Sequence, residues 1–154
     1  MLIREHAENY IKSGLVPIPL SREGDGKGTN IEGWPGIYFE AQQFGEHNNI
    51  GLNVLLSKLK HLDWDSHNTL IFAPKFCKST LEGGIIHPDT KKLIVTHYYY
   101  LKEGSSGDEF VKRNYPNGKT IAEFRVEGNA VVEPSIAETK LFDIKKVEHR
   151  FNLL

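Results

Sequence analysis

Leu59-Lys60-His61-Leu62-Asp63-Trp64-Asp65 is the segment around which the fold of this chain is predicted. Polar and apolar residues alternate from His61 to Asp65, as they do in a β-strand with one face on a core. Side chains two residues apart lie on the same face of a strand. We therefore expect a strand over residues 59–65 in which Asp63 and Asp65 point the same way, with Leu62 and Trp64 on the other face.

The two aspartates form a candidate metal site. Carboxylates held this close repel each other, and one becomes protonated unless a cation lies between them. Hard oxygen ligands on one face are typical of Mg²⁺ or Mn²⁺ sites. An Asp-x-Asp pattern is common, so the alternative is a strand end that carries two solvated acids.

The residues before this strand predict one clear helix and two more strands. Ile3, Ala7, Tyr10 and Ile11 form an apolar stripe at helical spacing. Prolines in the first strand indicate a sheet edge, because proline donates no ladder hydrogen bond. We expect a helix over residues 2–13 that ends at Gly14, a strand over 15–20, a glycine-rich loop over 21–36, a weak helix over 38–45 and a strand over 49–56.

The residues after this strand are rich in β-forming side chains. We expect a helix over 67–77 with Ser66 as its N-cap, turns at Gly83-Gly84, Pro88-Asp89 and 103–107, a strand over 92–101, a short helix over 108–115, a hairpin of strands 120–126 and 130–133 joined by Glu127-Gly128-Asn129, and a strand or helix within 141–154. These elements predict one α+β domain over residues 1–154, with a mixed or antiparallel sheet flanked by helices.

Composition sets limits on the class of protein. The chain has 154 residues, 39% hydrophobic and 25% charged, as in one soluble globular domain. Cys77 is its single cysteine, which excludes an internal disulfide and favours a reducing, cytoplasmic setting. The sequence contains no long apolar run of the kind that predicts a membrane span, so we expect none. The net charge of −1 provides no general basic field for nucleic acid.

Four further residues are candidates for binding a phosphorylated substrate. Glu123 and Arg125 alternate along one predicted strand, where the guanidinium could clamp a triphosphate or form a structural ion pair with Glu123. His97 could donate to a phosphate and gain charge at modest cost, or could be an ordinary core or surface histidine. Lys27, in the glycine-rich loop, could contact phosphates or be a solvated lysine.

Seven short segments, spread from about residue 7 to residue 136, follow one another in a fixed order along the chain. They are 14–20, Lys27 with Gly33-Trp34, Asn49-Ile50-Gly51-Leu52, Leu62-Asp63-Trp64-Asp65, Thr96-His97-Tyr98-Tyr99-Tyr100, Ile121-Ala122-Glu123-Phe124-Arg125 and Ala130-Val131-Val132-Glu133-Pro134-Ser135. In this order they resemble the archaeo-eukaryotic primase superfamily, in particular the bifunctional primase-polymerase domain of plasmid and phage replication proteins.

The resemblance implies an RRM-like catalytic core with the active site in a cleft on the sheet. Asp63, Asp65 and Glu123 would hold two divalent ions, Mg²⁺ or Mn²⁺, and His97 would contact the phosphates of the incoming nucleotide. The activity would be template-directed nucleotidyl transfer from nucleoside triphosphates on a single-stranded DNA template or primer. A helicase or accessory domain would be a further partner.

The sequence departs from the family before His97. Ile94-Val95-Thr96 replaces the usual Ser-Gly-Gly, while Gly83-Gly84 precedes His87, which makes His87 a rival for the nucleotide histidine. Two other functions therefore stay open. One is a metal-dependent nuclease or phosphatase that uses the same acids, and the other is a degenerate domain that binds nucleotide or single strands. The tyrosines at 98–100 either stack on bases or pack a strand.

Overall fold

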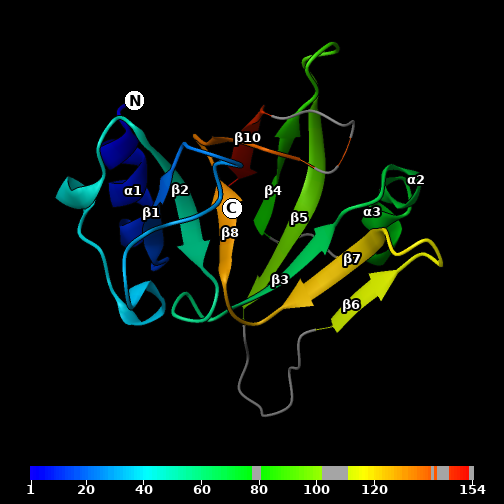
Figure 1. Ribbon diagram of the computed structural model, residues 1–154, viewed down its shortest axis with the longest axis horizontal. Helices are drawn as coiled ribbons and strands as arrows, with labels where there is room; N and C mark the ends of the chain where they lie inside the picture. The colour runs from blue at the N-terminus through cyan, green and yellow to red at the C-terminus, as the bar shows by residue number, and fades with distance from the viewer. Residues whose placement is uncertain (78–80, 102–110, 140, 142–145, 153–154) are drawn as a thin grey trace.

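The computed structural model describes residues 1–154 except 78–80, 102–110, 140, 142–145 and 153–154 (Figure 1). The fold is α+β and mostly strands, and every strand pairing in the described residues is antiparallel. The helices are α1 Ile3–Lys12, α2 His67–Leu70, α3 Ala73–Phe76 and the 3-10 turns η1 Trp34–Gly36 and η2 Ala41–Gln43. The strands are β1 Pro17–Ser21, β2 Asn48–Asn53, β3 Leu59–Trp64, β4 Leu81–Ile86, β5 Leu93–Leu101, β6 Val111–Asn114, β7 Thr120–Arg125, β8 Asn129–Val132, β9 Ile136–Ala137 and β10 Val147–Asn152.

The smaller sheet has the order β1-β2-β8 and is covered by α1 (Figure 1). The apolar stripe of α1 is buried at Ile3, Ala7 and Tyr10, as its helical spacing predicted. The Tyr10 hydroxyl also donates to the Glu133 carbonyl at 2.7 Å, which ties the helix to the chain beyond β8. The proline-containing β1 lies at the sheet edge, so that prediction is confirmed.

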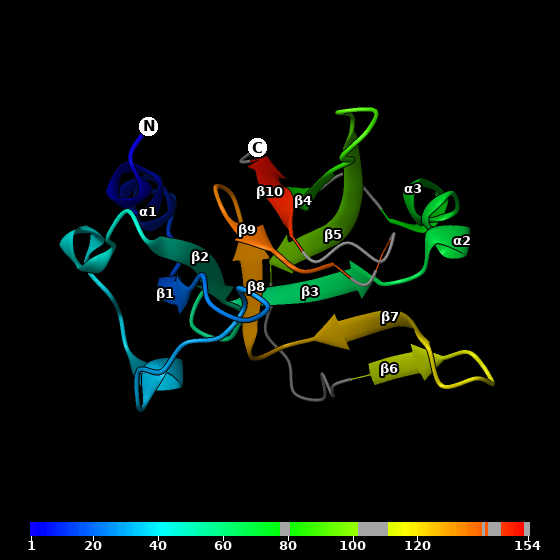
Figure 2. The same cartoon turned by 45° about the horizontal axis from the view of Figure 1, so that its top comes forward.

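The larger sheet has the order β6-β7-β3-β5-β4-β10-β9. Figure 2 shows β3 between β7 and β5, with α2 and α3 beyond its end. The strand predicted over 59–65 is therefore present as β3, in the interior of the sheet, where both of its edges are paired. No helix in the described part of the chain is long and apolar enough to cross a membrane.

The predicted hairpin of residues 120–133 is wrong. β7 and β8 follow each other closely in sequence, yet β7 pairs with β3 and β6, whereas β8 pairs with β2 in the other sheet. The reason is burial, because Ala130, Val131 and Val132 are all buried and β2 places them in the core under α1. Residues 126–128 therefore connect two sheets.

Three other predictions also need correction. Residues 111–114 of the expected 108–115 helix form β6, because a strand there pairs with the edge of β7. Residues 108–110 and the turn expected at 103–107 lie outside the described residues. Gly83-Gly84 lies within β4 rather than in a turn. The helix expected over 67–77 is split into α2 and α3, because Pro74 cannot donate within a helix.

The remaining expectations are met in part. The weak helix over 38–45 is reduced to the 3-10 turn at Ala41–Gln43. Ser66 precedes α2 but does not cap it with its side chain; its hydroxyl is hydrogen-bonded to that of Tyr115 at 2.8 Å. The tail forms a strand, β10, between β4 and β9.

Candidate functional site

Three neighbouring strands bring two of the predicted acids and the histidine into one row. Asp63 on β3 lies opposite Glu123 on β7 and opposite His97 on β5. Residues directly opposite each other in an antiparallel pair project from the same face of the sheet. Asp63 therefore has a carboxylate on one side and an imidazole on the other.

A second row lies one pleat away on the same face. His61 on β3 lies opposite Arg125 on β7 and Tyr99 on β5. Its ring stacks on Tyr99 with centroids 4.7 Å apart and an angle of 9° between the planes. Tyr99 is fully buried and Tyr98 nearly so, which leaves neither ring exposed for stacking on a base.

The third acid, Asp65, joins this group just beyond the end of β3. The Asp65 amide donates to the Ile121 carbonyl at 3.0 Å, which continues the pairing with β7 by one residue. Asp63, Asp65 and Glu123 each offer a carboxylate oxygen, and these atoms lie within 4.8 Å of one another. The structure thus brings together Asp63 on β3, Asp65 just after β3 and Glu123 on β7, and we call these three acids the acid group.

Arg125 balances part of the charge of the acid group. Its guanidinium donates to Glu123 Oε2 through Nε at 3.1 Å and through Nη2, and Nη1 donates to the Asn129 carbonyl at 3.4 Å. Burial disfavours the cation, but the hydrogen bond to Glu123 and the charges of the three acids outweigh it, so the pKa of Arg125 is raised. The structural ion pair between Arg125 and Glu123, one of the two predicted roles of Arg125, is present.

His97 is held by two neighbours through its Nδ1 atom. Nδ1 lies 2.8 Å from His61 Nε2 and 3.3 Å from Asp63 Oδ1. One proton can serve the short contact between the two imidazoles, with either ring as the donor. His61 is 1% exposed, so His97 is positioned by a buried partner.

The histidines of the site are neutral at physiological pH. Burial, followed by the charges of Lys27 and Arg125, lowers the pKa of His97 to about 3. Burial is also the main reason that the pKa of His61 lies well below its usual value. The expectation that His97 gains charge at modest cost is therefore wrong, although a neutral imidazole still donates through one nitrogen.

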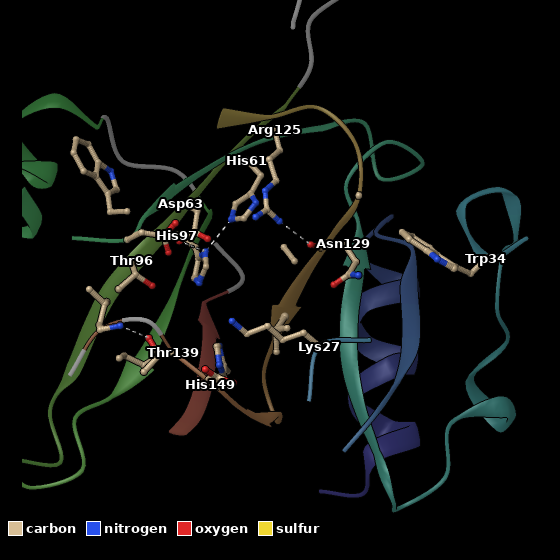
Figure 3. Close-up of a pocket in the computed structure, with 18 residues that line it drawn as sticks. Lys27, Trp34, His61, Asp63, Thr96, His97, Arg125, Asn129, Thr139 and His149 are labelled. Atoms are coloured by element: carbon tan, nitrogen blue, oxygen red, sulfur yellow. Dashed lines mark hydrogen bonds and ion pairs between the residues drawn. The ribbon is translucent and has the colours of Figure 1, made fainter. Parts of the chain in front are cut away.

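A cavity of about 360 Å³ opens on this face of the larger sheet and extends to β8 (Figure 3). Asp63, Asp65 and Arg125 line it from the larger sheet, and Lys27 enters from the loop after β1. His97, Lys27 and His149 point toward the same open space in Figure 3. The cavity is thus the place where most of the predicted site residues meet.

No model of a known protein family matches this chain, and no curated protein matches it. The chemistry of the cavity is therefore the basis for assigning a function. Carboxylates, imidazoles and two cationic side chains in one pocket are suited to a ligand that carries both metal ions and phosphates.

Lys27 is positioned by a buried asparagine. The Asn49 amide donates to the Gly26 carbonyl at 3.0 Å and to the Ile136 carbonyl at 2.7 Å, and its oxygen accepts from the Ile136 amide at 3.1 Å. Gly26 has a φ of +76°, and a Cβ there would lie 2.8 Å from the Ile136 carbonyl oxygen. Asn49 therefore fastens the loop that carries Lys27 to β9.

The two candidate histidines lie in different places. His87 follows β4, and its Nδ1 accepts from the amides of Asp89 and Thr90 in the turn before β5. His97 lies in the cavity, opposite Gly83 on β4. Gly83 of the glycine pair therefore lies beside His97 in the sheet, although the pair precedes His87 in sequence.

Sequence reasoning missed His61 and His149. His61 stands two residues before Asp63, so the alternation that selected the two aspartates also places it on their face. His149 lies on β10, is 4% exposed and lines the cavity. Nothing in the sequence around His149 distinguishes it from a surface histidine.

Proposed function

We propose that this chain is the catalytic domain of a primase-polymerase that transfers nucleotides from nucleoside triphosphates to a growing strand. The observation that carries the proposal is the acid group beside a cavity that is also lined by His97, Arg125 and Lys27. In this proposal β7, β3 and β5 belong to the RRM-like core, and the cavity is the active-site cleft.

The acid group fits a pair of divalent ions. Three carboxylates with oxygens within 4.8 Å form the hard oxygen environment that Mg²⁺ and Mn²⁺ prefer. Two such ions, when bound, align an attacking hydroxyl and stabilise the leaving pyrophosphate. Asp63 lies centrally, between Glu123 and His97, so it is the residue that we expect both ions to share.

The cationic and imidazole side chains are assigned to the triphosphate. A guanidinium binds phosphate oxygens in a bidentate manner, so Arg125 can exchange its contact with Glu123 for one with the nucleotide. His97 donates one N–H, and Lys27 adds a point charge from the opposite wall. A cavity of about 360 Å³ also lies within the range of small-molecule sites.

The proposal names partners as well as a substrate. Single-stranded DNA would serve as template or primer, because the proposed reaction copies one strand. The net charge of −1 predicts weak non-specific binding to DNA, so a helicase or accessory domain is expected to supply affinity for the template.

A primer-extension assay tests the proposal. The protein is incubated with an end-labelled primer on a template, Mg²⁺ or Mn²⁺, and either ribo- or deoxyribonucleoside triphosphates. We expect longer strands from the wild type and none from Asp63→Ala or Asp65→Ala variants that keep the wild-type circular dichroism. Asp89→Ala, an exposed acid in the turn before β5, is the control and should extend the primer normally.

The same assay separates the alternatives. Synthesis that persists in both aspartate variants would show that the acid group is not the catalytic centre. Shortened strands in the absence of nucleotides would indicate a nuclease that uses water as the nucleophile. The contact between Arg125 and Glu123 favours the second alternative, a non-catalytic binding domain, because the guanidinium partly neutralises the acid group. That alternative predicts template binding with neither lengthening nor shortening.

A further inference from the structure

A second group of metal-binding atoms lies beside the acid group and shares Asp63 with it. It consists of His61, Asp63 and His97, whose ligand atoms lie within 4.8 Å of one another. The donors differ from those of the acid group, since two are imidazole nitrogens and one is a carboxylate oxygen. We call these three residues the histidine group.

The spacing of the histidine group is close to that of a metal site. His97 Nδ1 lies 2.8 Å from His61 Nε2 and 3.3 Å from Asp63 Oδ1. Ligands about 2.0–2.1 Å from a tetrahedral ion lie about 3.3–3.4 Å from each other. An ion could therefore replace the proton between the imidazoles after the two rings separate by roughly half an ångström.

Buried nitrogens without partners provide an independent indication of a ligand. In the described part of the chain, His61 Nδ1 and both ring nitrogens of His149 are buried without a hydrogen bond. His149 is 4% exposed and lines the same cavity, with its ring centroid 6.4 Å from that of His97. Buried polar atoms usually have a partner, which is often an ordered water or an ion.

We propose that His61, His97 and Asp63 bind one transition-metal ion, such as Co²⁺ or Zn²⁺, with its open side toward the cavity. Imidazole ligands favour these ions, whereas Mg²⁺ prefers oxygen ligands only. His149 faces the open side and is placed to accept a hydrogen bond from a water on the ion.

The site extends the proposed function but does not depend on it. If both groups are filled, the Asp63 carboxylate lies between two chemically different ions, one bound by nitrogen and oxygen and the other by oxygen only. An ion on His97 Nδ1 also fixes the proton of that ring on Nε2, which leaves Nε2 as a donor for phosphate. The histidine group can nevertheless bind its ion without any nucleotide present.

Titration with Co²⁺ tests the site on the wild-type protein, and no variant is needed. Nitrogen ligands in a four- or five-coordinate site give Co²⁺ strong visible absorption, whereas an octahedral site of oxygens absorbs weakly. We expect strong absorption that saturates at one ion per chain. Weak absorption throughout the titration would overturn the proposal.

Two variants then locate the ion. His61→Phe keeps an aromatic ring against Tyr99 and removes the nitrogen, so we expect Co²⁺ to bind at least about 100-fold more weakly. The Asp65→Asn/Glu123→Gln double variant weakens the acid group and leaves the histidine group intact, so the strong absorption should persist. An unchanged affinity in the first variant, or lost absorption in the second, would show that the histidine group does not hold the ion.

These results are distinguishable from a failure of the proposed function. Absence of primer extension together with strong Co²⁺ absorption would remove the polymerase assignment and keep the metal site. Primer extension together with weak absorption would do the reverse.

Discussion

Replacing Asp65 by asparagine should stabilise the metal-free protein and remove its response to Mg²⁺. Asp65 is half-buried and belongs to a group of three carboxylates whose ligand atoms lie within 4.8 Å of one another. It is repelled by Asp63 and Glu123 and attracted by Arg125, so the neutral amide relieves more repulsion than it loses attraction. A side chain that binds a metal is often unfavourable for folding when the metal is absent.

The size of the effect follows from the spacing. Two unit charges 4.8 Å apart repel by about 3.5 kcal/mol at an effective dielectric constant of ~20 and by about 0.9 kcal/mol at ~80. With two repulsions and one attraction, the net gain is about one such repulsion. We expect Asp65→Asn to raise the free energy of unfolding in EDTA by about 1–3 kcal/mol, and each kcal/mol raises Tm by about 2–4 °C.

Mg²⁺ should stabilise the wild type more than the Asp65→Asn variant. An ion at ten times its Kd adds about 1.4 kcal/mol to the stability of a protein that binds it only when folded. The wild type should therefore gain about 3–6 °C in Tm on saturation with Mg²⁺, whereas the variant should gain little. Mg²⁺ is the appropriate probe, because the histidine group should not bind it strongly.

Differential scanning calorimetry in EDTA and in MgCl₂ measures both effects. Asp89→Asn makes the same change of charge on an exposed residue outside the cavity and should shift Tm by less than about 1 °C. A less stable Asp65→Asn protein in EDTA would refute the electrostatic reasoning. An undiminished Mg²⁺ response would show that Asp65 is not a ligand.

Two further predictions concern the residues around the cavity. Asn49→Ala leaves the Gly26 and Ile136 carbonyls without their buried partner, so it should lower the free energy of unfolding in urea by about 2–4 kcal/mol. The control Asn117→Ala, in an exposed turn, should lower it by about 0.5 kcal/mol or less. Equal losses in the two variants would contradict the role of Asn49. Burial, with the charges of His97 and Lys27, lowers the pKa of His149 to about 3, so below pH 6.5 the unfolded chain binds a proton that the folded chain does not, and stability falls as the pH falls toward 3. His149→Phe should therefore reduce the loss of stability between pH 7 and pH 5 by about 2 kcal/mol, and urea unfolding with an unchanged pH dependence would contradict the buried, neutral state of His149.

Local patterns in the sequence were sufficient for elements whose partners are nearby or whose periodicity is strong. The stripe of α1 specified a helix with one buried face, and the alternation around Asp63 specified β3 and the common direction of its acids. The α+β class followed from the same patterns, which left a mixed or an antiparallel sheet open. Glu123 was also placed on a strand, although its position opposite Asp63 depends on a register that no local pattern encodes.

The errors arose where distant residues decide the structure. Glu127-Gly128-Asn129 has the residues of a tight hairpin, but burial of β8 against β2 outweighs the preference of the turn. Gly83-Gly84 resembles a turn, yet a Cβ at Gly84 would lie 2.0 Å from the Ile94 carbonyl oxygen, so close contact between β4 and β5 accounts for the glycine. His149 reaches the cavity only because β10 pairs with β4, and that pairing spans more than sixty residues of sequence.

The central position of β3 makes strand alignment a requirement for chemistry as well as for packing. A slip of one residue would turn Asp63 and His61 away from the cavity and place Leu62 on the face that they occupy, because neighbouring side chains alternate between the faces. A misaligned chain could keep most of its backbone hydrogen bonds and still bind no ion. Under the proposed function, metal binding is therefore a sensitive reporter of correct folding, and spectroscopy of backbone content alone would not detect the slip.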